Sequence, residues 1–143
     1  MLHAAAGPLE PGEARSGYSA EGGHAAASAV DGDLSTGWFC APAQCAGQPS
    51  SLQVDLGAAH ALSAIRVTPY YADGRSYLYR VDGSVDGQTW TQLAAKVTHK
   101  AQTDVGDRYD VTGAYRYVRV TGFGNTTNAY TLHLQELAVY GVY

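Results

Sequence analysis

The stretch Leu52-Gln53-Val54-Asp55-Leu56 alternates apolar and polar residues and ends at Gly57. Successive side chains of a β-strand point to opposite faces, so this alternation is typical of a strand with one buried face. Further short runs of this kind follow along the chain, separated by turn residues such as Asp86-Gly87. They cover residues 62–68, 77–84, 89–93, 108–111, 115–121 and 131–140. Because no strong helical stripe accompanies them, the sequence predicts an all-β sandwich.

Length and composition narrow the function classes. The chain has 143 residues, enough for one domain with a substantial core. Its 45% hydrophobic and 15% charged residues exclude a disordered chain, and its net charge of −4 argues against a binder of duplex nucleic acid. No apolar run approaches the roughly 18 residues of a membrane span. Residues 1–15 lack periodicity, which predicts a flexible leader or linker remnant before a domain over 16–143.

Antiparallel connectivity sends successive loops to opposite ends of a sandwich. One end then collects the short loops near 57–61, 85–88 and 112–114. The other, here named the loop-rich end, collects the long loops 39–51, 70–76, 95–107 and 122–130. Long loops on a rigid scaffold usually carry binding residues, so we expect a binding site at the loop-rich end.

Five motifs in order resemble the discoidin family, also called coagulation-factor type C domains: Ala29–Trp38 (AVDGDLSTGW), Leu52–Gly57 (LQVDLG), Ser84–Trp90 (SVDGQTW), Tyr115–Val120 (YRYVRV) and Gln135–Gly141 (QELAVYG). The bacterial members are family 32 carbohydrate-binding modules. The resemblance implies a jelly-roll β-sandwich of the galactose-binding-domain-like, discoidin fold. It also implies a sugar-binding accessory module of a larger secreted enzyme. The chain lacks the cysteines that join the two ends of the vertebrate members, which favours the sugar-binding branch over the phospholipid-binding one.

The segment Asp31–Thr36 is also rich in oxygen donors, which hard cations such as calcium prefer. An ordinary Asp-Gly turn capped by Asp31, with Glu136 in a surface ion pair, is the alternative. The resemblance implies a structural calcium ion held by Ser28, Asp31, Asp33, Thr36, Gln135 and Glu136. In that set Asp31 contributes its carboxylate, Asp33 its backbone carbonyl and Thr36 both its carbonyl and its hydroxyl oxygen.

Sugar recognition needs a stacking aromatic ring and planar polar groups for the hydroxyls. Galactose-binding members generally use a His, an Arg after a Pro, an Asn and an aromatic. Here Tyr70 follows Pro69, while acidic loop residues suit an amino sugar, so a galactose-type sugar and an amino sugar both stay open. The candidate contacts are Glu21, His24, Phe39, Tyr70, Tyr71, Asp73, Arg75, Asn125, Asn128 and Tyr130.

The remaining aromatic, His and Cys residues have simpler interpretations. Trp38 and Trp90 occupy motif positions that the family buries, so both are expected in the core. His133 alternates with apolar residues on a strand and is expected to face outward without a functional role. Cys40 and Cys45 enclose four residues, which favours a local disulfide in an exported protein over two free thiols.

The sequence therefore predicts a non-catalytic carbohydrate-binding module that is extracellular and tethered to a catalytic domain. Its partner is an oligo- or polysaccharide, with no nucleic acid and no membrane. Two alternatives stay open. One is a discoidin module that binds a protein or a phospholipid, and the other is a small glycoside hydrolase that uses Asp31 and Asp33 as paired carboxylates.

Overall fold

The computed structural model describes residues 6–8, 13–16, 29–30, 33–39, 50–71, 76–100, 102–125 and 132–142. These contain the strands β1 (Ala6–Pro8), β2 (Glu13–Ser16), β3 (Trp38–Phe39), β4 (Ser50–Pro69), β5 (Tyr77–Ser84), β6 (Thr91–Lys96), β7 (Asp107–Asp110), β8 (Ala114–Asn125) and β9 (His133–Val142). Within these ranges there is no helix that is long and apolar enough to cross a membrane.

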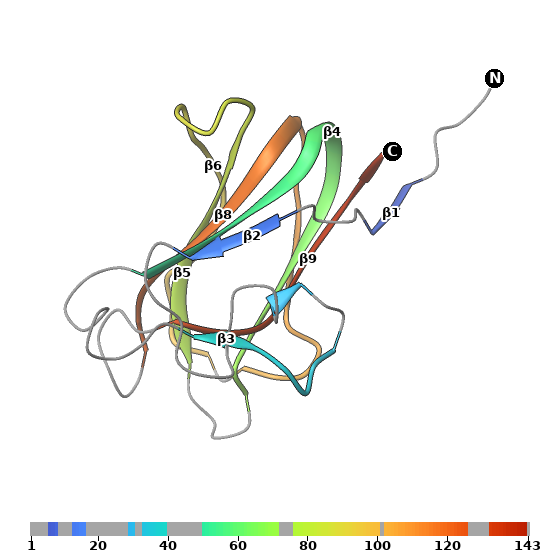
Figure 1. Ribbon diagram of the computed structural model, residues 1–143. Coiled ribbons are helices and arrows are strands. Elements are labelled where there is room, and N and C mark those ends of the chain that lie inside the picture. Colours follow the sequence, from blue (N-terminus) through green and yellow to red (C-terminus); the bar gives the residue numbers. More distant parts are fainter. Residues whose placement is uncertain are drawn as a thin grey trace.

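The strands form the two layers of the predicted sandwich (Figure 1). The first layer, named the β5 sheet, pairs β2, the first part of β4, β8, β5 and β6 in that order. The second, named the β9 sheet, pairs the second part of β4 with β7 and β9, and β9 with β1 and β3. All of these pairs are antiparallel, so the predicted fold class is confirmed.

Strand β4 runs through both layers. The sequence predicts two strands separated at Gly57, but the structure has one strand, which pairs with β8 up to Ala61 and with β9 from Leu62 onward. Gly57 has a φ of 84° and donates its N–H to Asp55 Oδ1 at 2.8 Å. The pairing with β8 shifts register between Asp55 and His60. A glycine adopts positive φ without steric cost, so this position bends the chain while the strand continues.

The core lies between the two layers and follows the predicted alternation. On β4, Leu52 and Val54 of the β5 sheet and Ile65 and Val67 of the β9 sheet are fully buried. Each such side chain stabilises the fold by about 1.5–3 kcal/mol relative to an exposed one. Trp38 is also fully buried, as expected.

Trp90 corrects the expectation that both tryptophans are core residues. It is only half-buried and is not part of the core cluster. The guanidinium carbon of Arg119 lies 3.9 Å from the centre of its ring. Trp90 stands in the connection between β5 and β6, outside the sandwich, so it covers a cation instead of filling the core.

Part of the stretch that the sequence assigns to a leader is strand. In β1, Ala6 pairs with Val142, and in β2, Glu13 pairs with Asp55. These short segments add one strand to each sheet. The rest of residues 1–15 lies outside the described residues.

The register of the pairs confirms which loops share an end. Gly122 at the end of β8 pairs with Ser50 at the start of β4, and Asn125 pairs with Tyr77 at the start of β5. Residues at the start of β7 and the end of β6 lie at this same end, as do those at the start of β9. At the opposite end, Ala61 pairs with Ala114 and Gly83 with Thr91. The strand ends that carry the long connections therefore share the loop-rich end.

Candidate functional site

The loop before β3 contains two of the predicted calcium ligands. Asp33 Oδ1 accepts hydrogen bonds from Ser35 N at 2.8 Å and from Ser35 Oγ at 2.6 Å. These bonds favour the charged carboxylate and hold the pKa of Asp33 below its ordinary value. The carbonyl oxygen of Asp33 accepts from Thr36 N at 3.2 Å and from Thr36 Oγ1 at 3.0 Å. The expected Asp33 carbonyl and Thr36 hydroxyl ligands therefore lie side by side.

This loop lies directly on strand β9. Gln135 Nε2 donates to the carbonyl oxygen of Leu34 at 2.9 Å. A Cβ added at Gly37 would collide with Gln135 Oε1 and would lie 2.9 Å from the carbonyl oxygen of Leu134. Only a glycine lets the backbone approach this closely. The loop thus contacts the strand segment that carries the other described candidates, Gln135 and Glu136.

Four of the predicted calcium ligands lie within the described residues, and their chemistry fits a hard cation: Asp33, Thr36, Gln135 and Glu136. Their donors are carbonyl, hydroxyl and carboxylate oxygens, which calcium prefers. The carboxylate of Asp33 is held by Ser35, and the resemblance assigns the carbonyl of Asp33, not its carboxylate, to the metal. Ser28 and Asp31 lie outside the described residues. Within the described ranges, no group of three or more His, Cys, Asp or Glu side chains could hold a metal ion.

At the loop-rich end, Tyr70 is half-buried and packs against the core. Its ring is stacked on the ring of His133, with centroids 4.5 Å apart and an angle of 1° between the planes. Its N–H donates to the carbonyl oxygen of His133 at 2.9 Å. One face of Tyr70 is therefore covered, and His133 supports an aromatic ring rather than simply facing outward. Tyr71, the next residue, is likewise half-buried.

The structure describes few of the other predicted sugar contacts. Phe39 pairs with His133 through the backbone, and Asn125 ends β8. The remaining candidates lie outside the described residues: Glu21, His24, Asp73, Arg75, Asn128 and Tyr130. Cys40 and Cys45 also lie outside them, so their disulfide stays a prediction.

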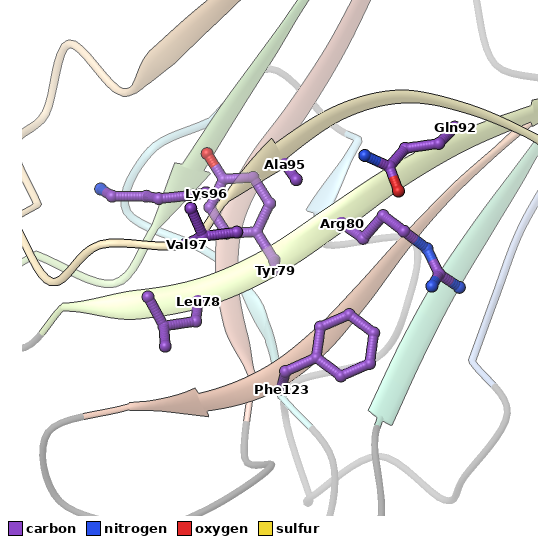
Figure 2. Close-up of a pocket in the computed structure, with 8 residues that line it drawn as sticks. All are labelled: Leu78, Tyr79, Arg80, Gln92, Ala95, Lys96, Val97 and Phe123. Atoms are coloured by element: carbon purple, nitrogen blue, oxygen red, sulfur yellow. The ribbon is translucent and has the colours of Figure 1, made fainter.

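A second feature near the loop-rich end was missed by sequence reasoning. A hollow of about 310 Å³ opens on the outer face of the β5 sheet (Figure 2). It is lined by Leu78, Tyr79, Arg80, Gln92, Ala95, Lys96, Val97 and Phe123. The sequence prediction ends this strand at residue 121 and places Phe123 in the following loop. In the structure β8 continues to Asn125 and brings Phe123 beside Arg80.

The comparisons with known proteins agree with the overall fold. The family model of the F5/8 type C domain matches residues 13–136. No curated protein matches the chain. Two solved structures are 25% identical to it. The family 32 carbohydrate-binding module (CBM32) of AlyQ, in complex with 4,5-unsaturated mannuronic acid, has a TM-score of 0.78 over 92% of this chain and 96% of that one.

The second structure at 25% identity is chitosan-binding module 1 from a chitosanase/glucanase of Paenibacillus sp. IK-5. Its TM-score is 0.71, and the match covers 94% of this chain and 98% of that module. The family 32 module of C. perfringens NanJ, in complex with galactose, is 22% identical and has a TM-score of 0.77 over 95% and 99%, which shows the shared fold. The family model covers most of the chain, and the TM-scores show that the overall fold agrees with that of these modules. The chain therefore belongs to the F5/8 type C (discoidin) domain family.

Proposed function

We propose that this chain is a non-catalytic carbohydrate-binding module of the family 32 type. The observation that carries the proposal is the similarity along nearly the whole chain to the AlyQ module, whose structure holds a sugar. The proposed binding site is the loop-rich end, where the end of β8 and the starts of β4 and β5 meet and where Tyr70 and Tyr71 follow the last residue of β4. The accessible part of the Tyr71 ring would offer a face for a pyranose, and polar residues of the loops would bind its hydroxyls.

The ion pairs of the described carboxylates support a binding role over hydrolysis. Asp55 accepts from Arg116 Nε at 2.8 Å and from Nη2 at 3.0 Å. Asp107 Oδ2 lies 3.1 Å from Lys96 Nζ. A glycosidase needs two carboxyl groups facing each other across the scissile bond. Asp33, one member of the predicted pair, is instead held in a turn by Ser35.

The proposal includes one structural calcium ion. Ser28, Asp31, Asp33, Thr36, Gln135 and Glu136 would hold it, and the contact between the 33–37 loop and β9 supports this set. The ion would fix the loop to the strand without contacting the sugar.

The proposal also places the module outside the cell, attached to a catalytic domain. The Paenibacillus module comes from a chitosanase/glucanase, which supports such an attachment. An exported protein would also carry the predicted disulfide between Cys40 and Cys45. For the ligand, a galactose-type sugar or an amino sugar follows from the candidate contacts.

A glycan array on the purified chain tests the function, followed by calorimetry with the best hit. An open site of this kind gives a weak affinity, roughly 10 μM to 1 mM. The variants Tyr71→Ala, Tyr130→Ala and Arg75→Ala probe the loop-rich end. The matched control is Tyr117→Ala, because Tyr117 pairs with Ser84 toward the opposite end of the sandwich. We expect at least one loop variant to lose binding and the control to keep it.

Two outcomes would contradict the proposal. Unchanged affinity in all three folded loop variants would place the site elsewhere. Binding to phosphatidylserine vesicles, with no hit on the array, would favour the phospholipid-binding alternative.

A further inference from the structure

The hollow on the outer face of the β5 sheet has the composition of a ligand site. Its volume of about 310 Å³ is at the small end of the range for ligand pockets, about 300–1,000 Å³, so it suits one sugar ring. Figure 2 shows Leu78 and Val97 toward one side of it and Arg80 and Gln92 toward the other. A pyranose has a similar division, with an apolar face of C–H groups and a rim of polar groups.

The Arg80 guanidinium is positioned before any ligand binds. Its Nε donates to Asp82 Oδ2 at 2.8 Å, and its Cζ lies 5.3 Å from the centre of the Phe123 ring. The Arg80 side chain is 39% exposed. Because the ion pair uses Nε, the terminal nitrogens of Arg80 have no hydrogen-bond partner among the described residues and remain donors beside the hollow. A guanidinium held in this way loses little freedom when it binds a ligand.

Phe123 supplies an apolar contact on the same face. The residue is 39% exposed, so part of its ring is open to solvent on the face that carries Arg80. Val97, at the rim, is 77% exposed. These two side chains and the half-buried Leu78 form apolar surface beside the donors of Arg80.

The charge of these strands favours an anionic ligand. Strands β5, β6 and β8 carry four of the nine basic residues of the chain and one of its thirteen acidic residues. The acidic residue, Asp82, is only 5% exposed and lies within 3.9 Å of both Arg80 and Arg119. Two cations thus share one carboxylate on the outer face. Of the other two basic residues, Lys96 is paired with Asp107 and Arg116 with Asp55, so the positive charge of this face comes from Arg80 and Arg119.

From these observations we propose that the hollow is a second carbohydrate site, which binds one carboxylate-bearing pyranose unit of a polyuronate chain. The terminal nitrogens of Arg80 form paired hydrogen bonds with the carboxylate, the geometry that arginine offers to planar anions. Phe123 and Leu78 contact the C–H groups of the ring, and the exposed amide of Gln92 binds a hydroxyl group. This site is separate from the one proposed at the loop-rich end.

The test uses an oligogalacturonate as the acidic probe and its fully methyl-esterified form as the neutral match. We expect the parent chain to bind the acidic probe more tightly than the ester, and this preference to fall as salt is raised. Arg80→Met and Phe123→Ala should each weaken binding roughly tenfold or more. In an NMR titration, the amides of Leu78, Arg80 and Ala95 should shift with the probe.

The matched control is Arg108→Met, which removes the same charge from β7 in the other sheet, where Arg108 is 57% exposed. It should bind the probe like the parent. Arg80→Met leaves Asp82 with Arg119, and Phe123→Ala truncates a side chain outside the core, so both should fold, as melting curves will check.

The inference is overturned if the parent does not bind the acidic probe, if it binds the ester equally well, or if Phe123→Ala and Arg80→Met bind like the parent. Tyr71→Ala distinguishes the two proposals. Loss of the glycan-array hit with retention of the acidic probe supports two separate sites. Loss of the acidic probe in Tyr71→Ala alone assigns that ligand to the loop-rich end and overturns the second site.

Discussion

Replacing Gly37 with Ala tests the contact between the proposed calcium loop and strand β9. The new Cβ would collide with Gln135 Oε1 and lie 2.9 Å from the carbonyl oxygen of Leu134. The amide of Gln135 can rotate away, but the Leu134 carbonyl belongs to a paired strand and cannot move independently. Overpacking of this kind costs about 1–3 kcal/mol. For a domain of this size, the melting temperature should fall by roughly 3–12 °C.

The assay is thermal unfolding of Gly37→Ala and of the parent, each with calcium and with a chelator. If calcium joins the loop to the strand, the stabilisation by calcium should shrink in Gly37→Ala. Gly57→Ala is the matched control, because no atom lies within 4 Å of its new Cβ and its φ of 84° gives only backbone strain. That strain costs about 1–2 kcal/mol and should leave the calcium response unchanged. A Gly37→Ala protein as stable as the parent would refute the close approach of loop and strand.

Three further outcomes are expected. Chelation should lower the melting temperature of the parent, because a ligand that binds only the native state stabilises it. Asp31→Ala should abolish this shift. A chelator that changes neither the melting temperature nor the metal content would contradict the calcium site. In urea titrations, Trp38→Ala should cost about 3–5 kcal/mol of stability and Trp90→Ala about 1 kcal/mol or less; equal losses would contradict their different burial. Burial and a hydrogen bond to Asp107 raise the pKa of Tyr79 above its ordinary 10.0. Above about pH 10 the unfolded state therefore loses a proton that the native state keeps, so the free energy of unfolding should fall as the pH rises. Tyr79→Phe should show a shallower alkaline loss in pH-dependent melting, and an unchanged slope would assign that loss to other groups.

The layers of the fold and the gathering of loops could be predicted because they depend on local and topological rules. Alternation in Leu52–Leu56 marks the buried face of β4 regardless of what covers it, and Leu52 and Val54 are indeed fully buried. Antiparallel connectivity then determines which loops share an end, and the pairing of Ser50 with Gly122 agrees with it. The contact between the 33–37 loop and Gln135 followed from the family resemblance and not from these rules.

The position of Trp90 and the hollow beside Arg80 could not be predicted, because both depend on contacts between strands and the apolar-polar alternation of a single strand does not specify these. Trp90 has the residue type of a core position, but its place beyond the end of β5 leaves it over Arg119. Arg80 and Phe123 each follow the outward phase of their own strand. Their proximity arises from the register between β5 and β8, where pairing shifts between Leu78 and Tyr79. A one-residue change in that register would alter which side chains line the hollow.

A continuous chain of contacts connects the proposed calcium loop to the aromatic residues of the loop-rich end. Gly37 lies against Leu134 and Gln135, and the next two residues form β3, in which Phe39 pairs with His133. His133 in turn carries the stacked ring of Tyr70 and accepts the hydrogen bond from its N–H. An ion that holds the loop on β9 would therefore also hold the strand segment that positions Tyr70, although it would contact neither the ring nor a sugar. A metal site of purely structural function could therefore influence the affinity of the loop-rich end for a sugar, because the bound ion would act through the position of β9. The effect of the ion on sugar affinity should then follow its effect on the stability of this edge of the β9 sheet.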